Sequence, residues 1–495
     1  MNIKKFILFF EQYSLKLLIG WIIILFMLYS ALSIVRHNNF QSGAFDLGIY
    51  DQSVWQYSQF QAPFNTIKNR FILGDHLALT LPILSPLFWV WDDVRMLLLF
   101  QAFWVSLSTL PVFLLIRSRG YSSLVALSLS FIYSLFYGIQ FMVFFDFHPV
   151  AIGVGLIPWI AYFLESKRWK LLWISIILLL LTQENMGLAL SSLGLIYIFQ
   201  KQYRKIALGF IFGGFAASFI AVFATRSFSP VGFEYTPQID TNPINLISNF
   251  FNSNDKQLVW LYSFSWFSFL PILSPGAILA VLLDLSQYFI TGEAFARMWS
   301  PFMHHRAMLA PFLLLGTLDA INLLKRKFSR RAGSRFAGKP EIIAIVMIFV
   351  ALLLQYKFHF ALNKLSKPIY WQSEKWTEDN RKLIAMIPKD ISIASTQNII
   401  PHLSHRSQIY LIYPREHEIK GNPCGRKLCW WLDFPMEAKY IMVNLSEQQT
   451  LTQLLESPQN FREAVENMEK LGKIKLEKQI GTAYLYKVKM RRVTL

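Results

Sequence analysis

The chain has 495 residues, of which 54% are hydrophobic and only 16% are charged. Soluble domains carry roughly 25% charged residues, so this composition excludes an ordinary soluble protein and predicts a chain that crosses a membrane several times. A formal net charge of +18 is also typical of nucleic-acid-binding proteins. Here, however, the basic residues cluster in short loops between apolar runs, as they do in the cytoplasmic loops of membrane proteins. We therefore expect membrane lipid as a partner and no nucleic acid. The basic loops are residues 117–120, 165–170, 200–205 and 325–339.

The chain starts with a basic and then apolar stretch, residues 1–18. Such a start is also typical of a cleaved signal peptide. No small-residue cleavage site follows the apolar run, so we interpret residues 16–35 as a retained first membrane span.

Eleven apolar runs have spanning or near-spanning length, and a twelfth, residues 77–91, contains Pro82 and Pro86. If residues 77–91 crossed the membrane, the most basic loops would lie outside, against the positive-inside rule. We therefore expect a re-entrant or surface-lying segment there, a cytoplasmic N-terminus and an extracytoplasmic C-terminal part, in a bacterial inner membrane. The predicted spans are 16–35, 95–117, 121–141, 149–165, 170–182, 184–200, 205–224, 258–273, 276–292, 302–324 and 341–362.

The first outer loop, residues 36–94, is rich in polar residues that can do chemistry. Asp46 and Asp51 lie in a short stretch rich in aromatics and glycine, and a pair of acids suits one general base and one orienting acid. Two capping or solvated carboxylates are the structural alternative. Arg70, Asp75 and His76 follow and are candidates for substrate binding.

Glu184 is the sharpest single feature of the sequence. The apolar run before it, residues 170–182, would reach only about 20 Å as a helix, whereas the hydrocarbon core is about 30 Å thick. The turn that carries Glu184 should then lie below the outer headgroups, where a carboxylate needs a partner or a wet cavity. A helical hairpin that simply reaches interfacial water is the alternative.

Histidines and an arginine mark two later outer segments. His148 lies in "FDFHP", and His304, His305 and Arg306 lie in "MHHRAM". Arginine suits bidentate phosphate binding, whereas interfacial anchoring is the structural alternative. A zinc site built from Asp75, His76, His148 and His304 has no close-spaced ligand motif to support it, so the identity of any metal is left open.

Residues 366–495 are more polar and predict a small extracytoplasmic α/β domain. Strands are expected near 392–396, near 407–412, and in "AKYIMVNL" and "TAYLYKVKM", with one or two helices in residues 447–472. Cys424 and Cys429 are candidates for a disulfide in an oxidising compartment. The fold class is therefore an all-α polytopic membrane protein, residues 1–365, with a C-terminal α/β domain.

Several stretches resemble a bacterial family of membrane proteins of unknown function, which in turn resembles the GT-C superfamily of integral-membrane glycosyltransferases. The resemblance covers most of the chain. The stretches are "FDLGIYDQSVW", "GDHLALTLPILSPLFWVW", "LLLFQAFWVSLSTLPVFLLIRSRG", "FDFHP", "TQENMGL" and, in the tail, "IPKDISIASTQNIIPHLSHRSQIYL".

The resemblance implies a GT-C-like helical bundle and a polyprenyl-phosphate-linked sugar as donor. It implies a catalytic acid in the first outer loop, where Asp46 stands, and a second acid in a later outer loop, where Glu184 stands. The chain lacks a D-x-D motif and the "HPPL"-like segment of the mannosyltransferases, near whose place "GDHLALTLP" stands. The donor headgroup and the need for a divalent metal ion as cofactor are therefore left open.

The expected function is transfer of a sugar from a polyprenyl phosphate to an acceptor at the outer membrane face. A transporter or lipid flippase is the first alternative and predicts charges at mid-membrane with inverted halves, which the sequence does not show. A non-catalytic envelope protein is the second. The sequence leaves the acceptor and the oligomeric state open.

Overall fold

A computed structural model describes residues 3–235, 242–329, 340–449 and 457–489. The chain is mostly helical and forms two compact units. We call them the helical unit, with Met1–Ser33, His76–Thr80 and Leu99–Lys367, and the mixed unit, with Ile34–Asp75, Leu81–Leu98 and Pro368–Leu495. Most of the basic loop predicted at 325–339, and residues 450–456 of a predicted helical segment, lie outside the described residues.

Among the described residues, five helical stretches are long and apolar enough to cross a membrane, which supports an integral membrane location. A sixth is counted if the pair α7 (Ser123–Ser134) and α8 (Tyr137–Phe145), bent by 44° at a short break, is one span. The five are Leu8–Asn38, Arg95–Ser118, Lys201–Phe228, Phe295–Lys327 and Pro340–Phe358.

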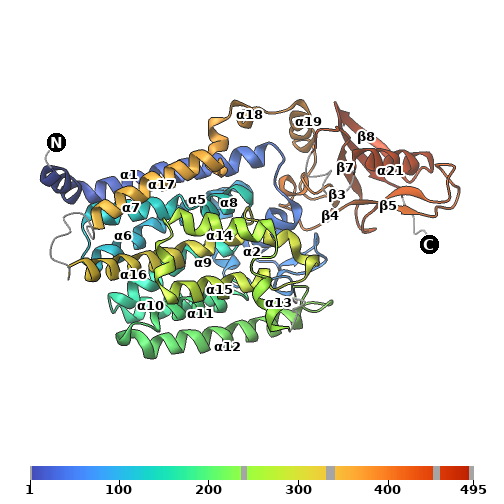
Figure 1. The fold of residues 1–495 in the computed structure, drawn as a ribbon. Coiled ribbons are helices and arrows are strands. Elements are labelled where there is room, and N and C mark those ends of the chain that lie inside the picture. Colours follow the sequence, from blue (N-terminus) through green and yellow to red (C-terminus); the bar gives the residue numbers. More distant parts are fainter. Residues whose placement is uncertain (1–2, 236–241, 330–339, 450–456, 490–495) are drawn as a thin grey trace. The chain divides into compact units, whose positions relative to one another are not determined.

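The helical unit is a bundle of long and short helices (Figure 1). Helix α10 has 12 residues and reaches only about 18 Å, so the prediction of a short helix before Glu184 is confirmed. The helices are α1 (Ile3–Asn38), α5 (Arg95–Leu107), α6 (Thr109–Ser118), α7 (Ser123–Ser134), α8 (Tyr137–Phe145), α9 (Val150–Glu165), α10 (Trp169–Leu180), α11 (Met186–Tyr197), α12 (Arg204–Phe228), α13 (Pro243–Ser248), α14 (Asn254–Trp266), α15 (Pro275–Phe289), α16 (Leu309–Ser329) and α17 (Pro340–Phe358).

Several of these helices begin at side chains that cap the free backbone N–H groups of the first turn. The Asn242 side chain accepts from the N–H of Ile244 at the start of α13, and Ser253 accepts from Lys256 at the start of α14. Short 3-10 turns connect or extend the helices: η3 (Lys201–Tyr203), η4 (Leu270–Leu273), η5 (Glu293–Trp299), η6 (His304–Met308) and η7 (Ala361–Ser366).

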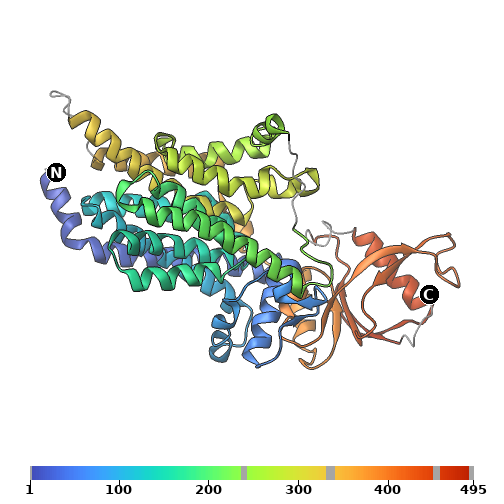
Figure 2. The same cartoon turned by 90° about the horizontal axis from the view of Figure 1, so that it is seen from below.

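Helices α11 and α12 lie side by side (Figure 2) and approach closely through small residues. A Cβ atom on Gly187 would lie 2.2 Å from the carbonyl oxygen of Gly214, and one on Gly214 would lie 2.3 Å from that of Gly187. Ser218 on α12 donates to the carbonyl of Glu184 at 2.8 Å and accepts from the N–H of Leu188 at 3.1 Å. Small residues thus allow the backbone contact that holds the start of α11 in place.

The mixed unit combines most of residues 36–94 with the C-terminal part of the chain. Residues 77–91, expected to be re-entrant or surface-lying, form two four-residue helices separated at Ser85–Pro86. The loop elements are η1 (Ala44–Gly48), α2 (Ile49–Ser58), β1 (Phe64–Asn65), β2 (Arg70–Phe71), η2 (Ile72–Gly74), α3 (Leu81–Leu84) and α4 (Leu87–Val90).

The C-terminal part contains a five-stranded sheet in the order β4-β3-β7-β9-β8. Strand β3 runs parallel to β4 and β7, whereas β9 pairs antiparallel with β7 and β8; β5 and β6 form a separate hairpin. The elements are α18 (Pro368–Trp371), α19 (Lys375–Ile384), β3 (Ile393–Ser395), η8 (Ile400–His402), β4 (Ile409–Leu411), β5 (Tyr413–His417), β6 (Cys429–Asp433), β7 (Tyr440–Asn444), α21 (Pro458–Lys470), β8 (Ile474–Ile480) and β9 (Ala483–Val488). The predicted strands that became β3, β4, β7 and β9 are confirmed, whereas β5, β6 and β8 were not predicted.

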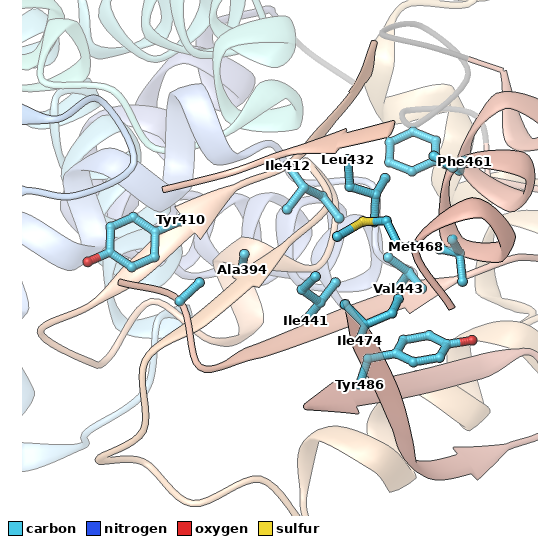
Figure 3. Close-up of a cluster of buried hydrophobic side chains, with 13 residues drawn as sticks. Ala394, Tyr410, Ile412, Leu432, Ile441, Val443, Phe461, Met468, Ile474 and Tyr486 are labelled. Carbon is cyan, nitrogen blue, oxygen red and sulfur yellow. The ribbon is translucent and has the colours of Figure 1, made fainter. Parts of the chain in front are cut away.

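One apolar core joins α21 to the strands (Figure 3). Phe461 and Met468 of α21 pack with Val443 of β7 and Leu432 of β6, and all four are buried. Burying each such side chain contributes roughly 1.5–3 kcal/mol, so this core is a major source of the stability of the C-terminal part.

Candidate functional site

Glu184 lies in the turn between α10 and α11, and its side chain is almost fully buried. The Nδ1 atom of His76 lies 2.8 Å from Oε1 of Glu184, and the N–H of Leu77 donates to Oε2 at 3.2 Å. Because a carboxylate only accepts, we infer that His76 Nδ1 carries the proton. The buried carboxylate therefore has a partner at each oxygen, as an acid in an apolar bundle requires.

His76 is held from a second side by an aromatic ring. Its imidazole stacks on Tyr235 with centroids 4.7 Å apart and planes 10° apart. The Gln183 amide lies 3.1 Å from Nδ1. Glu184 and Tyr235 together fix the orientation of the imidazole within the helical unit.

Three further imidazoles form a stack. The ring centroids of His148 and His304 are 3.7 Å apart, and those of His304 and His305 are 3.8 Å apart. Phe145 of α8 borders His148 and His304, while Tyr288 of α15 borders His305. Residues from two segments that are far apart in sequence therefore meet in one cluster.

Arg306 lies beside this stack in η6 and is fully buried. Its Nε donates to the carbonyl of Ser300 at 3.3 Å, and its Nη2 donates to the carbonyl of Met298. The guanidinium also lies 5.1 Å from the ring centroid of Tyr288. A Cβ atom at position 138 would meet the Arg306 carbonyl at 2.5 Å, so Gly138 of α8 allows η6 to approach.

Asp284 on α15 belongs to the same cluster, and the sequence interpretation did not identify it. It is buried and lies close enough to Arg306 for an electrostatic interaction. A lone carboxyl inside an apolar run was the available signal, because such residues rarely face lipid. His76 in turn lies within electrostatic reach of His304 and His305, which connects the stack to Glu184.

The cluster contains buried polar atoms without hydrogen-bond partners among the described residues: Oδ2 of Asp284, Nδ1 of His304, Nδ1 of His305 and Nη1 of Arg306. An unsatisfied buried polar atom costs roughly 1–3 kcal/mol, so folded proteins usually satisfy such atoms with protein, water or a ligand. Four of them in one cluster indicate a polar binding site inside an otherwise apolar bundle.

The remaining predicted residues of the first loop lie in the mixed unit. Asp46 is partly buried in η1, whose Ala44 N–H donates to the carbonyl of Gln397 at 2.9 Å. A Cβ atom on Gly48 would meet the side chain of Ile400 at 3.1 Å, so this glycine lets η1 lie close to Ile400. Asp46 therefore lies where the first loop packs on the C-terminal part of the same unit.

Two more first-loop residues have defined places near η1. Asp75 forms an ion pair with Lys68 at 3.1 Å, and the Lys68 ammonium lies 5.5 Å from the ring centroid of Phe45. Arg70 is largely buried in β2, opposite Asn65 of β1. Asp75 thus belongs to the mixed unit, whereas His76, the next residue, belongs to the helical unit.

Asp51 is fully buried in α2 and binds His405, which the sequence interpretation missed. His405 Nε2 lies 3.1 Å from Oδ1 of Asp51, and its Nδ1 lies 2.6 Å from Oδ1 of Asp92. The Ser404 hydroxyl donates to Asp51, and Lys389 donates to Oδ2 of Asp92 at 2.8 Å. With a carboxylate at each ring nitrogen, His405 is held as an imidazolium.

The two carboxylates also change the protonation of His405. Burial disfavours the charged ring, but the charge and hydrogen bonds of Asp51 and Asp92 outweigh burial and raise the pKa of His405 to about 9. The hydrogen bond from His405, opposed by partial burial and supported by Lys389, lowers the pKa of Asp92. This cluster is a stable set of paired charges rather than a free acid or base.

Within the described residues, no three His, Cys, Asp or Glu side chains gather as a metal site would require. The zinc alternative therefore finds no support in the geometry of those residues. Cys424 and Cys429 are joined by a disulfide that closes the turn before β6.

A comparison of the sequence with protein families matches residues 36–424 to the family described as predicted membrane protein (DUF2079). The chain belongs to this family. The DUF2079 match begins just before Asp46 and includes the Glu184 pair, the imidazole stack, Arg306 and His405. No curated protein matches the chain.

Proposed function

We propose that the protein is a GT-C-like integral-membrane glycosyltransferase that transfers a sugar from a polyprenyl-phosphate donor to an acceptor at the outer membrane face. The observation that carries the proposal is the buried polar cluster of His304, His305, Arg306 and Asp284, with unpartnered atoms inside a membrane bundle. A donor with a lipid tail and a charged phosphate requires such a site close to lipid.

The phosphate leaves with negative charge, and preorganised cations stabilise that charge. Arg306 is our candidate for this role, because its Nη1 remains available after its bonds to two backbone carbonyls. His304 and His305 each carry a further ring nitrogen without a partner. These groups would hold the diester, and no metal ion is required by the proposal.

The acceptor hydroxyl needs a base within hydrogen-bond reach, and we assign this role to Asp46. Glu184 suits an orienting role better, because both of its oxygens already accept hydrogen bonds. In this scheme Glu184 holds His76, and the acceptor oxygen attacks the anomeric carbon while its proton passes to Asp46. In-line displacement then inverts the anomeric centre.

The proposal includes the topology predicted from charge bias: eleven spans, a cytoplasmic N-terminus and the C-terminal part outside, in a bacterial inner membrane. Several of the shorter apolar helices, such as α10 and α11, would then reach only part of the way across the bilayer. Short helices that surround a polar cluster are acceptable where protein or water shelters their ends.

The test is an assay of the purified protein in lipid nanodiscs with a panel of polyprenyl-phosphate sugars, measuring released polyprenyl phosphate. Activity is expected with at least one donor, and Asp46→Asn should abolish it. Glu477→Gln, which changes an exposed acid on β8, is the matched control and should retain activity. Normal activity in Asp46→Asn would remove Asp46 from the role, and inactivity of the wild type with every donor would favour the flippase or non-catalytic alternative.

A further inference from the structure

A polar cavity lies in the mixed unit, and none of the residues assigned to glycosyl transfer lines it. It has a volume of about 420 Å³ and opens to the surface beside the paired charges of His405. The cavity is built from the first outer loop on one side and the stretch after α19 on the other, both within this unit. The lining residues are Trp55, Gln59, Asp92, Lys389, Asp390, Ile391, His405, Arg406, Ser407 and Gln408.

Asp92, His405 and Lys389 form one group of paired charges in the wall, whereas Asp390 is exposed and interacts electrostatically with Arg406. Asp92 accepts from His405 with one oxygen and from Lys389 with the other. Arg406 is buried and donates to the backbone carbonyls of Leu403, Pro388 and Ile391. An anionic ligand would meet the Asp390 carboxylate and would have to compete with Asp92 for its cationic partners, so the cavity is poorly suited to an anion.

A ligand therefore meets an aromatic ring, neutral polar groups and the Asp390 carboxylate, which accepts hydrogen bonds from hydroxyls. The Trp55 indole is partly exposed and lies nearly parallel to the His405 ring, with centroids 6.1 Å apart. The side chains of Gln59, Ser407 and Gln408 are exposed and can donate and accept hydrogen bonds. A pyranose ring matches this combination, because it presents C–H groups on one face and hydroxyls at its edge.

The fixed charges also make the wall rigid. His405 is held by Asp51 and Asp92 and is bordered by the ring of Phe88 at 4.7 Å. A preorganised wall loses little entropy when a ligand binds. From the cavity, the paired charges and the partly exposed indole, we propose that this cavity binds a neutral hexopyranose unit of a glycan, with Trp55 stacked on the sugar ring and Gln408 bonded to its hydroxyls.

This binding site stands independently of the proposed transfer reaction, because binding can be measured without turnover. Saturation-transfer NMR on the full chain in nanodiscs, with a panel of methyl hexopyranosides as probes, should show transfer to at least one glycoside. Trp55→Ala should weaken that binding roughly tenfold or more. Gln408→Ala, a change at an exposed position that leaves the paired charges intact, should weaken it as well.

The matched control is Trp371→Ala, which removes an indole that is 52% exposed on α18 and does not line the cavity. It should leave glycoside binding unchanged. The proposal is overturned if the wild type binds no methyl glycoside, or if Trp55→Ala and Gln408→Ala both bind as the wild type does. It is equally overturned if methyl phosphate or tetramethylammonium, used as charged probes, binds at this cavity in place of the glycosides.

Discussion

The His405 cluster should make the stability of the mixed unit fall at alkaline pH. The pKa of His405 is raised from 6.5 to about 9 in the folded chain, because Asp51 and Asp92 outweigh the effect of burial. A group whose pKa is higher in the folded than in the unfolded state stabilises the folded state fully below the unfolded pKa. This stabilisation should therefore be complete below about pH 6.5 and disappear as the pH rises through about 9.

The size of the effect follows from the pKa difference. At about 1.4 kcal/mol per pH unit, the rise from 6.5 to about 9 corresponds to at most about 3.5 kcal/mol. The His405 side chain is only 11% exposed, but that of Asp92 is 47% exposed, so solvent screens part of the interaction. We expect about 2–3 kcal/mol, and His405→Gln should remove this contribution.

Hydrogen–deuterium exchange on the full chain in nanodiscs measures the local effect at α2 and around η8. After correction for intrinsic exchange rates, wild-type protection should fall by roughly thirty- to hundredfold between about pH 6.5 and about pH 9.5. His405→Gln should show reduced protection at the lower pH and little further loss. The matched control is His417→Gln, because His417 pairs with Asp433 in an exposed position and such a pair contributes about 0–1 kcal/mol. Equal pH dependence in His405→Gln and the wild type would refute the reasoning.

Three further predictions test packing, the buried acid and the membrane-facing loop. Gly214→Ala should lower the thermal midpoint in detergent and the free energy of unfolding by about 1–3 kcal/mol, because the added methyl meets the α11 backbone. Gly213→Ala, on the open side of α12, should leave the midpoint unchanged, and equal midpoints of the two variants would contradict the close approach of α11 and α12. Glu184→Gln should slow release of polyprenyl phosphate roughly ten- to hundredfold by weakening its bond to the histidine partner, and an unchanged rate would exclude that pair from the site. Val90 is 82% exposed and lies five residues before the span that begins at Arg95, so Val90→Cys labelled with an environment-sensitive dye should give blue-shifted emission in nanodiscs, unlike labelled Glu477→Cys. Emission typical of water at Val90 would show that the loop does not touch lipid.

The sequence alone determined the membrane location, the short helix before Glu184 and four of the strands in the C-terminal sheet. These features depend on the length and periodicity of local apolar runs, which are readable along the chain. It also identified most residues of the buried cluster, because histidines, acids and arginines are rare within apolar segments and therefore stand out.

Only the tertiary structure decided which of these residues meet. His76 pairs with Glu184 across 108 positions, and His405 binds Asp51 across 354. Asp284 lies in the same cluster as Arg306, whereas Asp46 and Asp75 lie in a different unit from Glu184. Which residues come together depends on helix rotation and on how distant segments pack. Periodicity along the chain carries no information about those contacts, since each is made between side chains whose local sequences are independent of one another.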